Sequence, residues 1–490
     1  MRYHTRIYAF RSRPDHAEFL DPGDWRSRIY RKSAGELRLY RPYLLERGER
    51  PLDVAVVGTG IAGMAAAWLL ATRHRVTVYE REGRIGGHTH TVDVPGPDGP
   101  IPVDTGFIVY NEPNYPNLTA LFRHLGVAAE ASKMTFAVSL DGGAFEYAGN
   151  LKGLTAQPAL LASRDYWRML SDTVRFYREA PRLLESAEAR RTSLGDYLAQ
   201  AGYSDAFARL HLLPMGAAIW SSTVEDIRAH PVAAFARFFA NHGLLKLTGR
   251  PEWRTVSGGS REYVKRLTAD YADAVRVGAE VAAIERDAAG ITVRLADGEA
   301  RRHDRVVIAA HADQALSMLA APSQEERALL GRFRYRPNTV VLHSDEGLMP
   351  KRRRAWASWN YLGAAASPSN ADLCVTYWMN RLQNIASPRP LFVTLNPPAM
   401  PRDETIHGVY ACAHPVFDSA ALEAQSLLWR LQGARHTWFC GSYFGSGFHE
   451  DALQAGLAAA EEAGGVRRPW RVAGESDRIA RAPHLAVARA

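Results

Sequence analysis

The chain has 490 residues and a formal net charge of +8, from 60 Lys and Arg against 52 Asp and Glu. Hydrophobic residues make up 47% and charged residues 23%, a balance that excludes an intrinsically disordered protein and supplies apolar material for more than one core. The positive charge is spread along the chain, so we expect no nucleic-acid partner.

The cysteines Cys374, Cys412 and Cys440 include no CxxC pair and no Cys/His cluster at metal-ligand spacing. We therefore expect no disulfide framework, no metal and a cytoplasmic location. The Arg-rich start of the chain lacks the continuous apolar stretch of a secretory signal, which argues against export by that route.

The first regular elements predicted follow an N-terminal extension, residues 1–51, that shows no sustained periodicity. Val54 to Val57 predicts a buried strand, Ile61 to Ala71 a helix of small residues, and Val76 to Tyr79 the next parallel strand. The window 52–71 approaches membrane-spanning length, but its glycine spacing favours a strand, a turn and a helix over a membrane span. These elements form one βαβ unit.

Later segments predict a second, interleaved domain and a return of the chain to the first one. Residues 155–240 have the apolar periodicity of helices, 279–285 and 291–295 predict strands, and 304–310 another buried strand. Aromatic-rich alternating segments between 335 and 425 favour an antiparallel sheet. We predict an α/β fold with this division: a discontinuous parallel-sheet domain at 52–135, 255–325 and 430–465; an interleaved α+β domain at 136–254 and 326–429; and a C-terminal tail at 466–490.

The turn between the first strand and helix has the spacing of a dinucleotide site. Gly58 lets the backbone approach a pyrophosphate, Gly60 removes a side chain that would collide with it, and Gly63 allows close packing of helix and strand. Glu80, at the end of the next strand, is placed to accept hydrogen bonds from ribose hydroxyls. The pattern predicts binding of FAD or NAD.

A second glycine turn distinguishes these cofactors. Arg84-Ile85-Gly86-Gly87-His88 resembles the GG motif of the amine oxidase, phytoene desaturase and protoporphyrinogen oxidase flavoprotein superfamily. The resemblance implies FAD and a Rossmann-type, GR2-like FAD-binding domain. It also implies that Thr105-Gly106 brings backbone to the isoalloxazine and that Val281 meets the adenine.

Near the end of the chain, Gly441 and the stretch Phe448-His449-Glu450-Asp451-Ala452 resemble the superfamily's closing flavin motif. A helix starting here would point its amino terminus at the flavin pyrimidine ring and stabilise negative charge on it. For Cys440 we favour a small apolar residue in a core strand over covalent flavin attachment. The residues predicted to bind FAD are Gly58, Gly60, Ile61, Ala62, Gly63, Glu80, Arg81, Arg84, Gly86, Gly87, His88, Thr105, Gly106, Val281, Gly441, Phe448, Asp451 and Ala452.

Several stretches resemble a narrower group, the FAD/NAD-binding proteins associated with cyclopropane-fatty-acyl-phospholipid synthases, over roughly residues 52–465. That resemblance implies an unsaturated or methylated fatty-acyl substrate carried on a phospholipid, a lipid methyltransferase partner, and peripheral contact with the inner face of the membrane. The matching stretches are 87–91, 106–111, 217–221, 241–245, 253–256, 377–380 and 447–451.

The expected reaction is hydride transfer from an acyl chain to FAD, with a base taking the neighbouring proton. By motif, His449, Glu450 and His88 are the catalytic candidates. Three alternatives stay open: a redox-neutral double-bond isomerase, a non-catalytic FAD-binding partner of a lipid methyltransferase, and an amine oxidase. Aromatic residues of the helical segment, including Phe235, Phe238 and Phe239, either line an acyl tunnel or form ordinary core.

One basic run has two interpretations. Lys351 to Arg354 precedes Trp356 and Trp359, a combination that could meet anionic lipid headgroups. The other interpretation is a solvated turn.

Overall fold

A five-stranded parallel sheet forms the centre of the dinucleotide-type part of the molecule. In this computed structural model its strand order is β12 (Val275–Arg276), β4 (Arg75–Tyr79), β3 (Asp53–Val57), β16 (Arg305–Ile308) and β22 (Thr437–Phe439). The apolar run of β3 is buried because strands flank it on both edges and helices cover it. The predicted βαβ unit and the predicted fold class are confirmed.

The structure describes residues 30–33, 36–39, 50–246, 248–364 and 374–481. Residues 51–490 form one compact unit, and residues 1–50 form another. Within the latter, β1 (Tyr30–Ser33) pairs antiparallel with β2 (Glu36–Leu39). The rest of the predicted N-terminal extension, to residue 49, lies outside the described residues.

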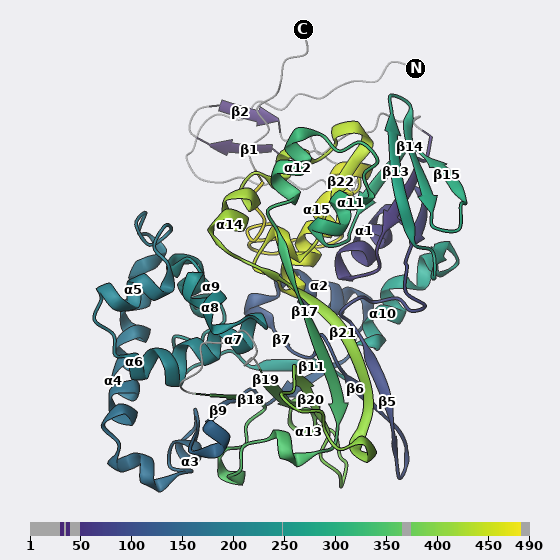
Figure 1. Cartoon of the computed structure of the whole chain (residues 1–490). Helices are drawn as coiled ribbons and strands as arrows, with labels where there is room; N and C mark the ends of the chain where they lie inside the picture. The colour runs from purple at the N-terminus through teal and green to yellow at the C-terminus, as the bar shows by residue number, and fades with distance from the viewer. Residues whose placement is uncertain (1–29, 34–35, 40–49, 247, 365–373, 482–490) are drawn as a thin grey trace. The chain divides into compact units, whose positions relative to one another are not determined.

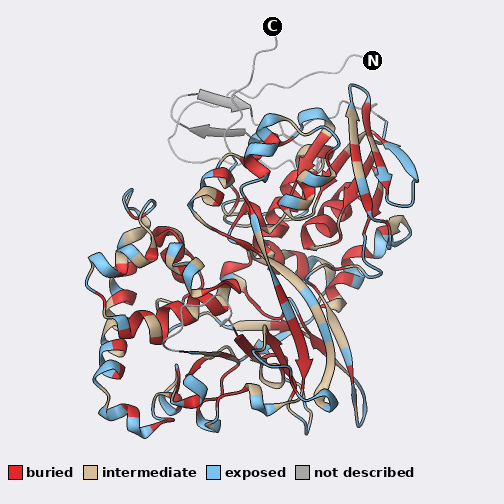
Figure 2. Cartoon of the chain, viewed as in Figure 1, coloured by how far each residue is buried: buried red, intermediate tan, exposed pale blue. Residues whose placement is uncertain are grey.

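Two helices of small residues pack directly on each other beside this sheet. They are α1 (Ile61–Ala71) and α15 (His449–Gly464), and Figure 2 shows them buried along almost their whole lengths. A Cβ atom at Gly456 would lie only 2.2 Å from the Ala62 carbonyl oxygen, so the backbones are in contact there. Glycine at 456 is what allows α15 to begin so close to the first glycine turn.

The remaining elements of this region surround the sheet. An antiparallel sheet of β13 (Val281–Asp287), β14 (Gly290–Leu295) and β15 (Ala300–His303) confirms the two strands predicted between 279 and 295. The helices here are α2 (Pro116–Leu125), α10 (Arg261–Thr268), α11 (Ala312–Met318), α12 (Gln324–Leu330) and α14 (Ser419–Gln425).

A seven-stranded sheet forms the second layer, and its long strands β17 (Arg334–His343) and β21 (Ile406–Val416) extend from the parallel sheet region towards the lower part of Figure 1. The antiparallel sheet predicted between 335 and 425 is therefore present. The sheet also contains the hairpin of β9 (Phe136–Leu140) and β10 (Phe145–Ala148) from earlier in the chain. This hairpin joins the sheet because β9 pairs in parallel with β18 (Trp359–Gly363), a pairing that sequence did not predict. The order is β10, β9, β18, β19 (Cys374–Trp378), β20 (Phe392–Leu395), β17 and β21.

The predicted helical segment is confirmed. It contains α4 (Arg164–Glu179), α5 (Leu194–Gln200), α6 (Asp205–Phe207), α7 (Leu213–Trp220), α8 (Val224–Ala229) and α9 (Val232–Asn241), and α3 (Leu151–Leu154) lies just before it. Phe235 and Phe239 are fully buried and stack with ring centroids 4.3 Å apart, so they are core residues and do not line a tunnel. Among the helices described, none combines the length and apolar composition needed to cross a bilayer.

Short strands connect the two layers. The hairpin of β5 (Thr91–Gly96) and β6 (Gly99–Asp104) follows the second glycine turn, and a small sheet is formed by β7 (Tyr110–Asn111), β11 (Trp253–Val256) and β8 (Ala129–Ser132). The short helix α13 (Met379–Leu382) follows β19. The division of residues 52–465 into an FAD-binding and a substrate domain stays a prediction.

Replacing Gly456 by Ala tests the packing of α1 on α15. Alanine is favoured over glycine in a helix interior by about 1 kcal/mol, so a loss of stability isolates the clash with Ala62. We expect Gly456→Ala to lower the free energy of unfolding by about 1 to 3 kcal/mol in urea denaturation. The control is Gly83→Ala, where no atom lies within 4 Å of the added Cβ; equal stability of the two variants would contradict the packing.

Candidate functional site

The first glycine turn has two tightly packed positions and one open position. A Cβ at Gly58, whose φ is +97°, would lie 2.7 Å from the Ala309 carbonyl oxygen, and one at Gly63 would lie 1.9 Å from the Gly58 carbonyl oxygen. At Gly60 an added Cβ meets no atom within 4 Å. Gly60 is also the N-cap of α1, and no side chain caps that helix. Space and unengaged N–H groups therefore coincide at the start of α1, as an anion site requires.

Glu80 lies beside this turn at the end of β4. Its carboxylate accepts hydrogen bonds from the backbone N–H of Thr59 and of Glu82, both at 3.0 Å. The backbone N–H of Ala279 donates to the Glu80 carbonyl at 2.8 Å, which brings the start of β13, and with it Val281, alongside. The two residues predicted to hold the adenosine therefore belong to neighbouring segments.

The second glycine turn contacts the first. The backbone N–H of Gly86 donates to the carbonyl oxygen of Thr59 at 3.1 Å, and a Cβ at Gly87 would lie 3.0 Å from the Gly60 Cα. Arg84 donates to the Gly87 carbonyl at 3.0 Å and is exposed, so its guanidinium lies at the rim of the two turns. Arg81 is exposed and pairs with Glu82 at 3.3 Å.

The segment after β6 packs directly on the second turn. A Cβ at Gly106 would lie 1.9 Å from the His88 carbonyl oxygen, which also accepts a hydrogen bond from the Phe107 N–H at 2.9 Å. The backbone N–H of the neighbouring Thr105 donates to the His90 carbonyl at 2.8 Å. Thr105 and Gly106 thus lie against the GG segment, and their contact with the isoalloxazine stays a prediction.

Asp104, which sequence reasoning did not single out, anchors that segment. It is fully buried and accepts hydrogen bonds from Thr91, from Ser260 and from the side-chain amide of Gln383. Burial raises its pKa to about 6, against the lowering effect of these donors. Asp104 therefore links β5, through Thr91, to the start of α10, through Ser260, and to the end of α13, through Gln383.

His449, the first residue of α15, contacts both the second glycine turn, through Thr89, and the segment after β6, through Phe107. Its ring stacks on Phe107 with centroids 3.9 Å apart. Its Nε2 lies 2.8 Å from the Tyr263 hydroxyl and 3.2 Å from the Thr89 hydroxyl, and these two hydroxyls are themselves hydrogen-bonded. Burial lowers the pKa of His449 to about 3, so the imidazole is neutral at physiological pH.

Glu450 is held by hydrogen bonds to α2 and α15, and the catalytic role predicted for it from sequence stays a prediction. It is fully buried, and its carboxylate accepts hydrogen bonds from the backbone N–H groups of Asn117 and Leu118, both at 3.0 Å. The side-chain amides of Asn117 and Gln454 donate to it as well. Because those backbone groups open α2, Glu450 supplies the anion at that helix's amino terminus.

The other residues of the closing motif shape the start of α15. Asp451 accepts from the Phe448 N–H at 2.8 Å and pairs with Arg478 at 3.3 Å, so its carboxylate is engaged. The Ala452 N–H donates to the Phe448 carbonyl at 3.1 Å. Gly441 follows β22 and the fully buried Cys440, whose thiol pKa is raised by burial. Cys440 is therefore a core residue.

His88 belongs to a cluster of histidines and one cysteine that sequence did not predict. Atoms of His88, Cys412 and His414 that could bind a metal lie within 4.8 Å of one another, and the ring of His311 lies 6.3 Å from that of His88. Solvent reaches His88, yet the surrounding protein lowers its pKa. The signal available in sequence was the alternation along β21, which places residues 412 and 414 on one face.

The tautomer of His414 decides what this cluster can bind. Asn338 accepts through its Oδ1 from Asn396, so its Nδ2 is the donor to His414 Nδ1, at 2.9 Å. The hydrogen of neutral His414 then lies on Nε2. That N–H can donate to a cofactor oxygen or nitrogen, whereas a metal requires a lone pair there.

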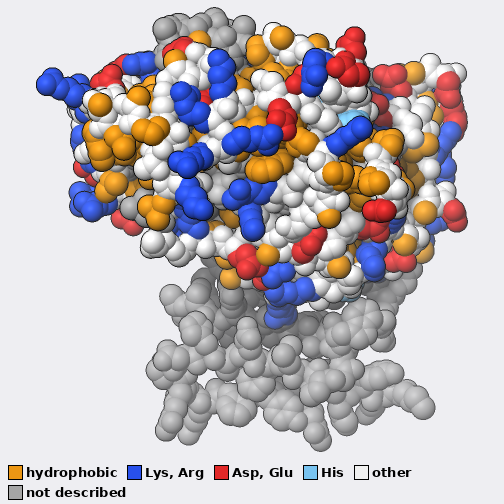
Figure 3. All heavy atoms as spheres, turned by 90° about the horizontal axis from the view of Figure 1, so that it is seen from below, with side chains coloured by type: hydrophobic (Ala, Val, Ile, Leu, Met, Phe, Trp, Pro, Cys, Tyr) orange, Lys and Arg blue, Asp and Glu red, His pale blue; other side chains and the backbone are white. Residues whose placement is uncertain are grey.

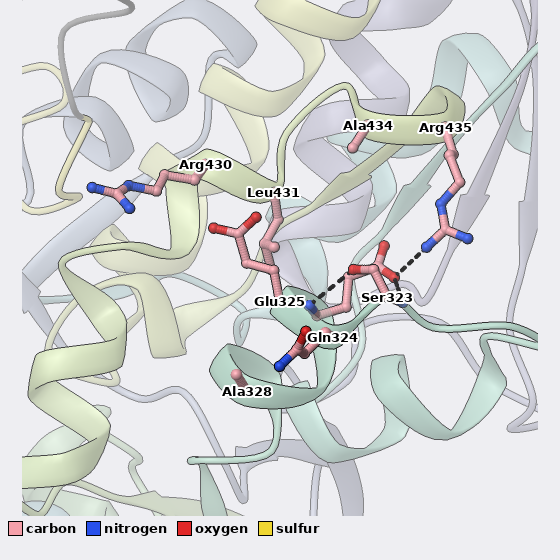
Figure 4. Close-up of a pocket in the computed structure, with 9 residues that line it drawn as sticks. Ser323, Gln324, Glu325, Ala328, Arg430, Leu431, Ala434 and Arg435 are labelled. Atoms are coloured by element: carbon pink, nitrogen blue, oxygen red, sulfur yellow. Dashed lines mark hydrogen bonds and ion pairs between the residues drawn. The ribbon is translucent and has the colours of Figure 1, made fainter.

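Two hollows lie in the surface of the described residues, and one of them includes a predicted site residue. One of about 510 Å³ lies between the start of α12 and residues 430–435 (Figure 4), and contains none of the predicted site residues. Its buried carboxylate, Glu326, is already paired with Arg286 and Arg435. The other, of about 600 Å³, lies along residues 83–91 and α10 and includes Arg84.

Comparison with known proteins shows the family. The model of the family described as flavin containing amine oxidoreductase matches residues 61–351. A Mycobacterium tuberculosis protein named as a flavin-containing monoamine oxidase, AofH, is 27% identical over 259 residues, covering 51% of this chain and 55% of that protein. The chain thus spans about half the length of the curated relatives it matches.

Solved structures show the same fold. A putrescine oxidase double mutant has a TM-score of 0.61 at 14% identity, with 84% of this chain and 99% of that chain covered. A CLA-producing fatty acid isomerase from P. acnes has a TM-score of 0.60 at 16% identity, with 83% and 97% covered.

The residues present fit FAD, which the family match gives as the cofactor. The open position at Gly60 and the uncapped start of α1 suit the pyrophosphate, and Glu80 suits the ribose. Gly106, the neutral His449 and the start of α15 converge where the flavin ring is expected. The assignment of individual residues to FAD stays a prediction.

Replacing Glu80 by Gln tests that assignment. Loss of a charged acceptor for ribose hydroxyls costs about 1.5 to 3 kcal/mol, so we expect the Kd for FAD to rise roughly 10- to 100-fold in fluorescence titration of the apoprotein. Glu82→Gln, which removes an exposed carboxylate two positions away, is the matched control. If both variants bind FAD like the unaltered protein, Glu80 does not hold the ribose.

Proposed function

Because the chain belongs to the flavin containing amine oxidoreductase family, we propose that it is an FAD-dependent oxidoreductase acting on unsaturated or methylated fatty-acyl chains carried on phospholipids. The resemblance of residues 52–465 to the proteins associated with cyclopropane-fatty-acyl-phospholipid synthases supports this substrate class. A lipid methyltransferase is then the proposed partner, because it would supply the methylated chain.

The observation that carries the proposal is the cluster of aromatic and neutral imidazole rings around His449. Phe107 stacks on its ring, and the adjacent Phe448 stacks on Phe238 with centroids 4.6 Å apart. His242, stacked on Phe238 at 3.9 Å, is neutral because burial lowers its pKa to about 3. Aromatic rings and neutral imidazoles suit an apolar chain.

The carboxylates nearest to His449 in sequence are not free to bind a cationic substrate. Glu450 is engaged by α2 and Gln454, and Asp451 by Arg478 and the Phe448 N–H. An ammonium group buried beside His449 would therefore obtain no charge partner from these two residues. This favours an acyl chain over an amine as the substrate.

When bound, FAD supplies a hydride acceptor for the carbon that is oxidised. The start of α15 directs unpaired backbone N–H groups towards the place where negative charge develops. The neutral His449 is in the protonation state that a proton acceptor needs, and Tyr263 keeps its hydroxyl proton because burial raises its pKa. We propose that the Nε2–H of His449 donates to the Tyr263 and Thr89 hydroxyls, which orient the imidazole, and that its Nδ1 takes the proton from the neighbouring carbon.

Double-bond isomerisation is a second candidate, favoured by the hydrogen-bonded group of His449, Tyr263 and Thr89. A neutral imidazole held by two hydroxyls can keep a proton and return it to the same substrate. No net oxidation would then occur.

The proposal is tested by anaerobic mixing of the FAD-loaded protein with phospholipids that carry unsaturated or methyl-branched chains. We expect bleaching of the flavin absorbance and loss of two hydrogens from the chain in mass analysis. His449→Asn should slow bleaching by roughly 100-fold or more while FAD stays bound. His124→Asn, at an exposed position of α2, should have no effect.

Other outcomes select an alternative. A shifted double bond with unchanged flavin absorbance would indicate the isomerase. Bleaching by amines and by no lipid would indicate an amine oxidase, and no change with either class would leave a non-catalytic FAD-binding partner.

A further inference from the structure

Exposed apolar side chains gather on the segment formed by α3, the short turn Pro158–Ala162 and the start of α4. Leu151 is 87% exposed, Trp167 55% and Leu161 44%. We call these three residues, with the cations described below, the docking face. Figure 3, which views the molecule from below, shows hydrophobic and basic side chains interspersed over one side of the surface.

Local contacts hold these apolar side chains outward. Asn150 caps α3 by accepting from the Gly153 N–H at 2.9 Å, and a Cβ at Gly153 would lie 2.5 Å from the Ala148 Cβ. Close packing on β10 therefore leaves Leu151 on the outer side. The indole N–H of Trp167 donates to the Leu161 carbonyl at 2.8 Å, which fixes these two residues side by side.

A hydrogen bond and a helix contact join the parts of the docking face. The Tyr166 hydroxyl donates to the Leu154 carbonyl at 2.7 Å, which ties α4 to α3. In turn, α3 contacts the turn Arg353–Ala355, which belongs to the basic run noted in the sequence. Residues far apart in sequence thus contribute to one surface.

The cations of the docking face come from both segments. Within the basic run, Arg352 is held by the buried Glu146 at 2.9 Å, and Arg353 by Glu346 at 2.6 Å. These pairs fix the turn and leave its other cations exposed. Within the described part of the chain, no ion pair is formed by the side chains of Lys152, Arg164, Lys351 and Arg354.

Trp356 does contact the basic run, with the Arg353 guanidinium 4.0 Å from the centroid of its ring, but it does not face solvent. Trp356 is buried against Phe392, and its indole N–H donates to the Pro350 carbonyl at 2.7 Å. Trp359 is half-buried in β18. The tryptophan exposed near the cations is Trp167, so apolar and basic groups do share a surface, although through another element.

We infer that the docking face binds the surface of an anionic phospholipid bilayer. Leucine and tryptophan side chains can enter the headgroup region while Lys and Arg pair with lipid phosphates. A second copy of this chain is a poorer occupant, because two docking faces would bring their unpaired cations together. The inference rests on the proposed function for its purpose, which is to bring the protein to acyl chains in a membrane.

Sedimentation of the FAD-loaded full chain with vesicles tests the inference. We expect binding to vesicles of phosphatidylcholine mixed with phosphatidylglycerol, much weaker binding to phosphatidylcholine alone, and loss of binding as salt is raised. Leu151→Asp combined with Trp167→Asp should weaken binding at least 10-fold. A separate variant, Lys152→Gln with Arg354→Gln, should weaken it while leaving the apolar residues in place.

The matched control is Val409→Asp, which changes a side chain that is 50% exposed on β21. Binding lost equally in this control, or absent with anionic vesicles, would overturn the inference. So would a concentration-dependent dimer that the Leu151 and Trp167 changes disrupt in a protein that ignores vesicles. Because sedimentation needs no turnover, vesicle binding without lipid oxidation would refute only the proposed function, and oxidation of detergent-dispersed lipid without vesicle binding would refute only this inference.

Discussion

Direct contact of backbone with backbone is the constraint on which the rest of the site depends. Gly63 packs on Gly58, Gly87 on Gly60, and Gly106 on His88, each at a distance that a side chain would prevent. Gly456 extends the same close packing to α15. The two glycine turns, the segment after β6 and α15 can therefore meet around one small volume. Because Gly60 has no side chain, part of that volume stays open.

The backbone geometry of the two glycine turns could be predicted from sequence because glycine spacing carries a specific physical requirement. Gly58 and Gly86 adopt positive φ angles, and the strand before Gly58 is buried as its run of valines indicates. These features are local, so they are visible within a few residues of each motif. The seven-stranded sheet was predicted only in part, because β9 joins it through a parallel pairing with a strand more than 200 positions later.

Residue roles set by distant partners could not be predicted in this way. Glu450 adjoins the flavin motif in sequence, yet its carboxylate binds Asn117, which lies 333 positions away. The C-terminal tail contains no motif, but Arg468 is buried and donates to Asn117, and Arg478 pairs with Asp451. Such contacts link α2, α15 and the tail, and motif proximity alone does not predict them.

The electrostatic character of the site follows from the same packing. Burial lowers the pKa of His449 and of His414, so both are neutral. Of the nearby carboxylates, Glu450 accepts from the start of α2 and Asp451 pairs with Arg478. The charges of the docking face lie instead on the surface, on α3, α4 and the basic run. Aromatic and neutral imidazole rings thus gather around His449, whereas the unpaired cations of the docking face lie on the surface.

A crystal structure of the chain with FAD would test the central claim most directly. The account predicts the pyrophosphate at Gly60 and the start of α1, with the flavin ring between Gly106 and the start of α15. FAD bound elsewhere, such as in the hollow between α12 and residues 430–435, or a flavin ring out of contact with His449, would contradict it.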